Sequence, residues 1–355
     1  MTGRGIVPFL CAFLLLAPAA ASASTTPKQV ASRIVAAGMP GAVVLVKDRA
    51  GTRVGTAGFA DVERRRPMRA DVAFRIGSVT KSFVAALVLQ LAARGTLRLD
   101  DPVERWLPGV VPNGATISLR RLLNHTSGLF DYSLDPRLTE AMYGRPTLWR
   151  PLELVAVGTS HPPLFAPGAG WGYSNTNYVL LGLVVQAATK TTVETQLARR
   201  ILRPLRLRDT ALPRTPRLRT PFAHGYVLPG RKDVTGIGTT WAWTAGGAAS
   251  TVRDVASFYS ALLKGRVLKP ALLREMRRTV PIGGNGDGYG LGLMLSSRGC
   301  GFSWGHNGSV PGYTTYVLNS PSAGRQLVVF VNGTPGSPEQ RTAVDSAVVE
   351  AFCAS

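Results

Sequence analysis

The sequence is poor in cysteine and histidine, and these shortages exclude several kinds of site. Its 355 residues include three cysteines and four histidines, and the histidines stand far apart, without the spacing of a metal-binding motif. We therefore expect no metal ion and no cofactor. After the amino-terminal 23 residues, no apolar run reaches the ~20 residues that cross a bilayer, so we expect no membrane span in the mature chain.

Two common catalytic signatures are missing as well. The chain has no Gly-x-Ser-x-Gly nucleophile elbow, which disfavours the hydrolases that place their serine on such a turn. The glycine-rich stretch 283–288 lacks the helix and the lysine of a phosphate-binding loop. A catalytic serine in this chain must therefore lie in another motif.

Acidic residues are also scarce, 20 against 41 lysines and arginines, which gives a net charge of +21 at pH 7. The arginines form short groups such as 64–66 and 214–219, with no interleaved aromatic residues and no nucleic-acid-binding motif. We expect no nucleic-acid partner. The charge favours attraction to an anionic cell-wall or membrane surface, although solvated charge without a specific partner is the simpler explanation.

The amino terminus has the pattern of a secretory signal. Arg4 precedes the apolar stretch 6–17, and small residues at 21–23 form a cleavage site. We expect cleavage after Ala23 and a secreted, extracellular, soluble protein. Cleavage would remove Cys11, so that Cys300 and Cys353 are natural disulfide partners in an oxidising exterior. Two buried free thiols are the alternative.

Strand-like patterns occur at both ends of the chain and helix-like patterns between them. They predict an α/β protein in which an antiparallel sheet flanked by helices is built from both termini, with an inserted, mostly helical domain. We expect residues 24–95 and 245–355 to form the sheet domain and residues 96–244 the helical domain. The expected strands are 41–47, 52–60, 289–295, 302–305, 314–318 and 326–331, and the expected helices include 30–37, 78–93, 248–263 and 339–352.

Ser78 and Lys81 open an otherwise apolar helix that runs to a glycine at position 95. Residues three positions apart share a helix face, and Lys81 is the only cation in the first turns. A desolvated lysine can have its pKa lowered enough to take the proton of a serine hydroxyl. Ser-x-x-Lys also occurs by chance, so this motif needs support from elsewhere in the chain.

Support comes from two later stretches. Tyr173-Ser174-Asn175 places a phenol and an amide two residues apart, after a Pro-Gly connector and before a helix. His306-Asn307-Gly308 places an imidazole beside a glycine that lets a ligand approach the backbone. Alone, the first could be a helix cap and the second an ordinary hairpin turn. In this order the three motifs are much more specific.

Together the three motifs resemble those of the serine penicillin-recognising enzymes: secreted D-alanyl-D-alanine carboxypeptidases, class C β-lactamases and their esterase relatives. The resemblance extends over the mature chain, through the stretches 74–77, 123–129 and 289–293 and the pair Cys300 and Cys353. It implies the β-lactamase/transpeptidase-like fold. The histidine of the third motif is most similar to that of a secreted carboxypeptidase.

The resemblance also implies roles. Ser78 would form an acyl-enzyme, Lys81 and Tyr173 would share the proton transfers, Asn175 would hydrogen-bond the substrate amide, and His306 would orient the phenol of Tyr173. The N–H groups of Ser78 and Ser309 would form the oxyanion hole. Phe130 and Trp241 are candidate walls of the cleft, although single aromatics are often core residues. His125 is better explained as a turn or capping residue.

The third motif departs from the carboxypeptidase pattern. Those enzymes hold the substrate carboxylate with a threonine in this motif and an arginine upstream of it. This chain has Asn307 in place of the threonine and Met294 in place of the arginine. Asn307 and the following Gly308 are still candidate substrate-binding residues. Arg298 is a candidate substitute for the arginine. Without these two groups, amides, esters or peptides with an amino-terminal D-residue become more plausible substrates.

These observations lead to one preferred function and several alternatives. We expect a monomeric D-alanyl-D-alanine carboxypeptidase that binds D-alanyl peptides and is acylated by β-lactam antibiotics. A class C-like β-lactamase, an esterase and a D-amino-acid amidase or peptidase would share the same serine, lysine and tyrosine. A non-catalytic protein that binds wall polymers through its positive surface is the alternative from another class.

Overall fold

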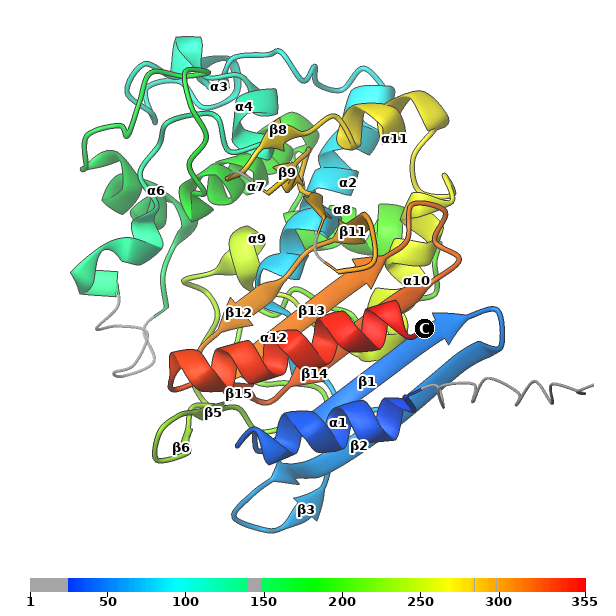
Figure 1. Ribbon diagram of the computed structural model, residues 1–355. Coiled ribbons are helices and arrows are strands. Elements are labelled where there is room, and N and C mark those ends of the chain that lie inside the picture. Colours follow the sequence, from blue (N-terminus) through cyan, green and yellow to red (C-terminus); the bar gives the residue numbers. More distant parts are fainter. Residues whose placement is uncertain (1–24, 139–147, 284, 298) are drawn as a thin grey trace, which may run out of the picture.

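Figure 1 shows the computed structural model of the chain, which describes residues 25–138, 148–283, 285–297 and 299–355. The predicted signal segment with its cleavage site, and Arg298, lie outside the described residues. In the described ranges, no helix is both long enough and apolar enough to span a bilayer.

The centre of the molecule is a ten-stranded antiparallel sheet built from both ends of the chain. Its strand order is β3-β2-β1-β14-β13-β11-β10-β9-β8, and β12 pairs with β13 beside this path. The strands are β1 (Gly41–Asp48), β2 (Gly51–Asp61), β3 (Arg66–Pro67), β8 (Val280–Pro281), β9 (Gly288–Tyr289), β10 (Met294–Ser296), β11 (Ser303–Gly305), β12 (Gly308–Val310), β13 (Tyr313–Asn319) and β14 (Gln326–Val331).

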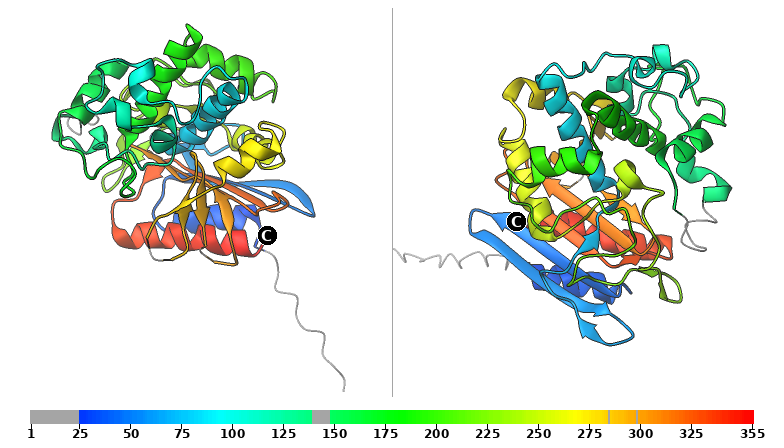
Figure 2. Two further views of the ribbon diagram at one scale, coloured as in Figure 1. Left: turned by 90° about the horizontal axis from the view of Figure 1, so that it is seen from above. Right: turned by 180° about the vertical axis from the view of Figure 1, so that it is seen from behind.

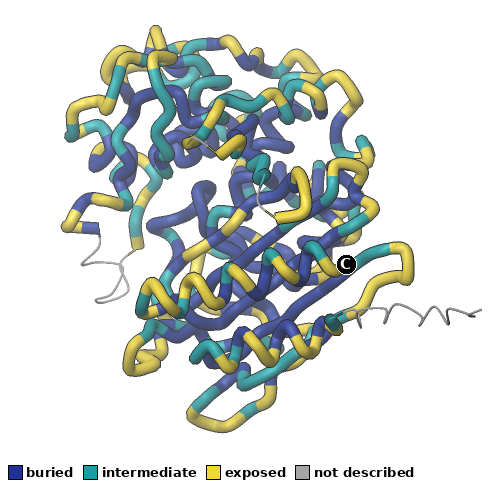
Figure 3. The backbone as a smooth tube through the Cα atoms, viewed as in Figure 1, coloured by how far each residue is buried: buried dark blue, intermediate teal, exposed yellow. Residues whose placement is uncertain are grey.

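Strand β1 is apolar from Gly41 to Val46, where both of its faces are covered. Ala42, Val44 and Val46 belong to one hydrophobic cluster, and Val43 and Leu45 belong to another. This is the two-residue alternation of a strand buried on both sides. Figure 3 shows the resulting buried centre of the sheet between more exposed helices.

Helices α1 (Pro27–Ala36) and α12 (Pro338–Cys353) cover one face of the sheet, as Figure 1 shows. Helix α1 begins at Thr26, whose hydroxyl accepts from the Gln29 N–H while the Gln29 side chain accepts from the Thr26 N–H. This capping box satisfies two of the N–H groups that a helix start leaves free. The buried residues of α1 and α12 belong to one hydrophobic cluster with those on the facing side of β1 and β14.

The opposite face carries α2 (Thr80–Ala93), α10 (Val252–Leu263) and the helical region, as the two views of Figure 2 show. The other helices described are α3 (Val103–Trp106), α4 (Leu119–Leu123), α6 (Pro151–Thr159), α7 (Asn175–Thr189), α8 (Val193–Leu197), α9 (Trp243–Gly246) and α11 (Pro270–Met276). The described residues also form three short 3₁₀ turns, η1 (Gly77–Val79), η2 (Gly114–Thr116) and η3 (Tyr132–Leu134), and a π-helical segment, η4 (Ala198–Leu202). The predicted fold class is confirmed. The domain boundaries remain a prediction.

Small sheets join the helical region to the large one. Strand β4 (Phe74–Arg75) pairs with β7 (Ala249–Ser250), and β15 (Gly333–Thr334) leads through β5 (Tyr226–Val227) to β6 (Lys232–Asp233). The β4–β7 pair explains why the helix expected from residue 248 begins only at Val252. Residues 249–250 are extended, and Thr251 caps the helix by accepting from the Asp254 N–H.

The strand expected over residues 289–295 is instead a hairpin of β9 and β10. The Gly290 N–H donates to the Leu293 carbonyl, and Gly292 has φ +71°, a conformation that favours glycine. A Cβ atom at Gly292 would lie 2.5 Å from the Ala85 Cβ and 2.7 Å from the Tyr178 hydroxyl. The turn therefore packs directly on α2 and α7, which an alternation pattern does not reveal.

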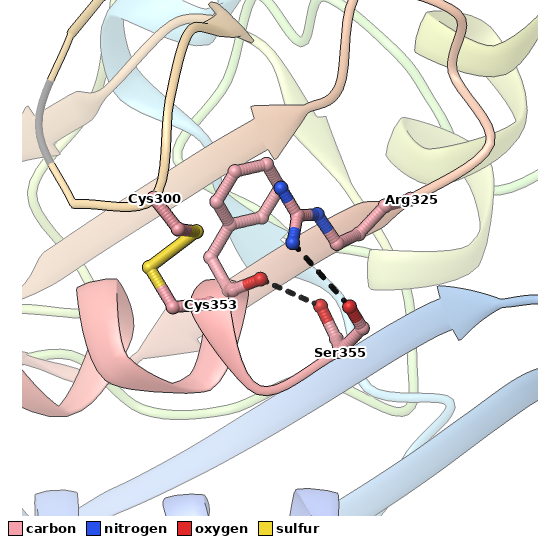
Figure 4. Close-up of a disulfide and its surroundings, with 5 residues drawn as sticks. Cys300, Arg325, Cys353 and Ser355 are labelled. Atoms are coloured by element: carbon pink, nitrogen blue, oxygen red, sulfur yellow. Dashed lines mark hydrogen bonds between the residues drawn. A yellow bond between two sulfur atoms is a disulfide. The ribbon is translucent and has the colours of Figure 1, made fainter.

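Cys300 and Cys353 are joined by a disulfide with a Cα–Cα distance of 5.4 Å, as the sequence predicted. Figure 4 shows that it ties the segment between β10 and β11 to the end of α12. The Arg325 guanidinium lies 4.4 Å from the ring centroid of Phe352 and donates to the Ser355 carbonyl at 3.5 Å. The disulfide thus fixes the carboxyl end of α12 to the sheet at the connection between β10 and β11.

The double substitution Cys300→Ser and Cys353→Ser is expected to lower the free energy of unfolding by about 4 kcal/mol. The disulfide closes a loop with a sequence separation of 53 residues, and its loss increases the entropy of the unfolded chain by about that amount. Urea denaturation measures the change. A reducing agent should destabilise the unsubstituted protein alone, and equal effects on both proteins would contradict the prediction.

Candidate active site

Ser78 lies in the tight turn η1, directly before α2. Two contacts hold this turn: the Thr80 hydroxyl donates to the Gly77 carbonyl at 2.7 Å and accepts from the Ala248 N–H at 3.1 Å. Gly77 has φ +52°, which an L-residue rarely adopts. The serine is therefore presented by a rigid turn at the amino end of a buried helix.

Lys81 is fully buried and points its ammonium at the serine. Its Nζ donates to Ser78 Oγ at 3.1 Å, to Asn175 Oδ1 at 2.7 Å and to the Ala245 carbonyl at 2.6 Å. Burial lowers the pKa of Lys81 to about 7, while the charge of Asp131 acts in the opposite direction. A large fraction of Lys81 is therefore neutral near pH 7 and able to accept the serine proton.

Tyr173 is the second group at the serine oxygen. Its hydroxyl donates to Ser78 Oγ at 2.7 Å, and Lys81 Nζ lies 4.7 Å from the centroid of its ring. Burial raises the pKa of Tyr173 well above its ordinary value, so the phenol stays protonated at neutral pH. Ser78 thus contacts one group that accepts protons and one that donates them.

Asn175 is held by the protein on every side that the structure describes. Its Oδ1 accepts from Lys81, and its Nδ2 donates to Asp131 Oδ2 and to Ser133 Oγ, both at 3.0 Å. Both amide hydrogens are therefore used within the protein. The expected hydrogen bond from Asn175 to the substrate amide is not supported by this arrangement, and Asn175 instead positions Lys81.

His306 contacts a different phenol from the one expected. Its Nδ1 donates to the Asn307 carbonyl at 2.6 Å, so its Nε2 accepts from the Tyr289 hydroxyl at 2.9 Å. Burial, followed by the charge of Lys81, lowers the pKa of His306 to about 3 and keeps the ring neutral. The expectation that His306 orients Tyr173 is corrected: it binds Tyr289, whose ring lies 6.3 Å from that of Tyr173.

Strand β12 lies directly against the serine turn. A Cβ atom at Gly77 would lie 2.6 Å from the Ser309 backbone nitrogen, and a Cβ atom at Gly308 would lie 2.0 Å from the Ile76 carbonyl oxygen and 3.2 Å from the Ser78 nitrogen. Only glycine permits this approach from both sides. It brings the Ser78 and Ser309 backbones together, as an oxyanion hole requires.

A cleft of about 190 Å³ opens at Ser78. Trp241 forms part of its wall, as predicted, and is 9% exposed. The cleft is lined by Ser78, Tyr132, Ser133, Asn175, Trp241, Ala242, Ala245, Gly246, Ser309, Val310, Pro311 and Thr334. Among the described residues, its lining contains no arginine, lysine or acidic side chain.

Three predicted substrate-binding residues do not line this cleft. The Phe130 ring stacks on His161 at 4.0 Å, and its carbonyl accepts from the hydroxyls of Ser174 and Thr176. Asn307 lines a separate cavity between the sheet and α12, which Met294 also borders. Gly308 provides the close backbone approach to the serine turn.

His125 and Asp131 were not predicted to belong to the site. His125 Nδ1 accepts from the Ser174 N–H at 3.2 Å, and its ring packs on Tyr173 with a centroid distance of 4.4 Å. Burial holds the pKa of His125 well below its ordinary value, so the ring is neutral. The stretch 123–129 was recognisable in the sequence, but its position beneath Tyr173 depends on contacts about 50 residues apart.

Replacing Asp131 with asparagine is expected to lower kcat by about tenfold. Asn175 Nδ2 would then donate to a neutral amide in place of a carboxylate, which weakens that hydrogen bond. Asn175 would be held less firmly, and so would Lys81, which donates to its Oδ1. Because Asp131 raises the pKa of Lys81, its loss should also move the acidic limb of the pH–rate profile below that of the unsubstituted enzyme. A limb that stays in place would contradict this electrostatic role. Asp71→Asn, at an exposed ion pair, is the control.

The structure, over the ranges that it describes, contains no group of three or more His, Cys, Asp or Glu side chains arranged to hold a metal ion. The chemistry available is that of a serine with a neutralisable lysine and a protonated phenol at its oxygen.

Comparison with known proteins identifies relatives among serine hydrolases. The profile of a protein family described as Beta-lactamase matches residues 27–350. Esterase EstB of Burkholderia gladioli is 31% identical over 301 residues, which are 75% of this chain and 72% of the esterase.

Two groups of solved structures are similar over almost the whole chain. A D-stereospecific amidohydrolase from Streptomyces sp. is 38% identical with a TM-score of 0.83, over 91% of this chain and 97% of that one. D-amino acid amidase from Ochrobactrum anthropi SV3, complexed with L-phenylalanine amide, is 31% identical with a TM-score of 0.84, over 92% and 96%.

Proposed function

The chain belongs to the beta-lactamase family of serine acyl-enzyme hydrolases, and from this membership we propose that it hydrolyses amides of D-amino acids or of peptides that begin with a D-residue. The observation that carries the proposal is the neutral lining of the Ser78 cleft. A substrate with a free terminal carboxylate needs a cation, and none lines the cleft among the described residues. Asp131 does not line the cleft, but its carboxylate accepts from Asn175 Nδ2 directly behind the lining, and a negative charge there favours a substrate that bears an ammonium group.

The residues account for each proton in such a hydrolysis. Neutral Lys81 takes the Ser78 proton as Oγ attacks the substrate carbonyl, and the N–H groups of Ser78 and Ser309 stabilise the negative oxygen. Tyr173 protonates the leaving nitrogen as the C–N bond breaks and recovers its proton from Lys81. Water then attacks the ester carbonyl, giving up a proton through the same pair, and Ser78 leaves as the hydroxyl.

The D-alanyl-D-alanine carboxypeptidase expected from the third motif is the second candidate. It shares the same serine, lysine and tyrosine, and β-lactams would acylate the same oxygen. Trp241, Val310 and Pro311 give the cleft an apolar wall that suits an apolar side chain in either substrate. The two functions differ in the charge next to the scissile bond, so substrate charge separates them.

The test compares five compounds with the purified mature protein: D-phenylalanine amide, L-phenylalanine amide, an acyl-D-Ala-D-Ala peptide, a labelled penicillin and a small ester. We expect release of ammonia from the D-amide at least tenfold faster than from the L-amide, and none with Ser78→Ala. Faster cleavage of the acyl peptide than of the D-amide would identify a carboxypeptidase and overturn the proposal. Rapid loss of the penicillin label would identify a β-lactamase.

We further propose that the protein is exported and cleaved after Ala23. The basic and apolar pattern of residues 1–23 supports export. The Cys300–Cys353 disulfide supports it independently, because such bridges persist in oxidising compartments. Amino-terminal sequencing of the protein recovered outside the cell tests this, and a chain that begins at Met1 would contradict it.

A further inference from the structure

A basic groove lies between α10 and the β1–β2 hairpin, which share one side of the molecule in Figure 1. We call it the α10 groove. Its volume is about 470 Å³, and its lining residues are Leu45, Lys47, Thr52, Pro204, Leu205, Arg206, Arg253, Ala256, Ser257, Ser260, Ala261, Arg266 and Gln326. None of them lines the Ser78 cleft, so the two sites are separate.

Four cations converge on this groove from four segments of the chain. Lys47 comes from β1, Arg206 from the turn after η4, Arg253 from the first turn of α10 and Arg266 from the turn that follows α10. Arg206, Arg253 and Arg266 are exposed, whereas Lys47 is partly buried. Since no acidic residue among those described lines the groove, the positive charges are not offset within it.

The four cations form no salt bridge to any carboxylate among the described residues. Some arginines elsewhere do pair with acids, as Arg33 does with Glu350 and Arg69 with Asp71. Within the described part of the chain, the one hydrogen bond made by these side chains is from Lys47 Nζ to Ser260 Oγ at 3.3 Å. Four unpaired cations therefore line one groove that holds no acidic side chain among the described residues.

The acidic residues nearest in sequence are already engaged. Asp48 pairs with Arg53, and Asp254 Oδ2 accepts from the Asp209 N–H at 2.9 Å and the Thr210 hydroxyl at 2.8 Å. The cations also affect one another: burial, then the charges of Lys264 and Arg266, lower the pKa of Lys47. A bound anion would relieve this repulsion.

We propose that the α10 groove is a binding site for a multivalent phosphate-bearing anion. Arginine guanidinium groups bind phosphate through paired N–H donors, and the hydroxyls of Thr52, Ser257 and Ser260 supply further donors at the same surface. The groove has room for more than one phosphate group. The phosphates could come from a soluble polyphosphate or a lipid headgroup, which share this chemistry and which the experiment separates.

The test uses inorganic tripolyphosphate and, separately, vesicles containing phosphatidylglycerol, with the full mature protein. The groove variant is Arg253→Gln with Arg266→Gln. The control variant is Arg274→Gln with Arg278→Gln, which removes the same charge from exposed positions outside the groove. Equal Ser78-dependent activity in both variants verifies that both are folded.

We expect the groove variant to bind tripolyphosphate at least tenfold more weakly than the control by calorimetry, with a smaller dependence on salt concentration. Vesicle binding that is lost in the groove variant alone would support the site and identify a lipid headgroup as the source. Equal losses in both variants would attribute binding to overall charge and overturn the proposal. Failure of both probes to bind the unsubstituted protein would also overturn it.

Discussion

Replacing Lys81 with methionine is expected to lower kcat/KM for the amide substrate by about 10³-fold or more. A positioned proton acceptor contributes about 10²- to 10⁴-fold to a rate, and Lys81 is the group with a pKa near 7 at the serine oxygen. Methionine retains the apolar length of the side chain, so the buried site stays filled. Steady-state kinetics measures the loss, and circular dichroism verifies the fold.

The unsubstituted enzyme should show the matching pH dependence. The neutral form of Lys81 takes the proton, so kcat/KM should rise as the pH increases through about 7 and level off above it. The methionine variant should lack this limb. The control is Lys232→Met, at an exposed position in β6, which should keep both the rate and the limb. A methionine variant with a tenth or more of the normal rate would rule out Lys81 as the base.

Replacing Gly308 with alanine is expected to lower kcat by about 10²- to 10³-fold, the cost of losing one oxyanion-hole donor. The added Cβ atom would lie 2.0 Å from the Ile76 carbonyl oxygen, so β12 has to move away from the serine turn. This movement separates the Ser309 N–H from the Ser78 N–H. The KM value should change much less, because the oxyanion forms only after binding.

Gly236→Ala is the matched control for this substitution. A Cβ atom at Gly236 would meet no other atom within 4 Å, so neither the rate nor the stability should change by a measurable amount. Urea denaturation of the Gly308 variant separates a displaced strand from a general loss of folding. A folded Gly308→Ala protein with normal kcat would exclude the proposed role of the Ser309 N–H.

Local sequence patterns determined much of the fold and the centre of the site. The apolar runs within 41–47 and 326–331 predicted strands, and the structure covers both faces of each, with alternate residues in two different hydrophobic clusters. Ser78 and Lys81 could be paired from their spacing, because residues three positions apart share a helix face. Tyr173 was placed beside them by resemblance, and its hydroxyl does contact Ser78.

The hydrogen-bond partners of the residues around Ser78, Lys81 and Tyr173 could not be predicted in this way. Asn175 is saturated by Lys81, Asp131 and Ser133, and His306 binds Tyr289. These contacts join residues between 17 and 94 positions apart, and no local period relates them. Phe130 resembled a cleft wall in sequence, yet its ring packs on His161.

The sequence by itself determined which chemistry the chain carries: a serine, a lysine and a phenol in the order of a serine hydrolase family. The tertiary structure alone decided what surrounds them, because burial and charge at a site depend on every segment that packs there. It lowered the pKa of Lys81 to about 7, used both hydrogens of the Asn175 amide, and left the cleft lining without a cation among the described residues.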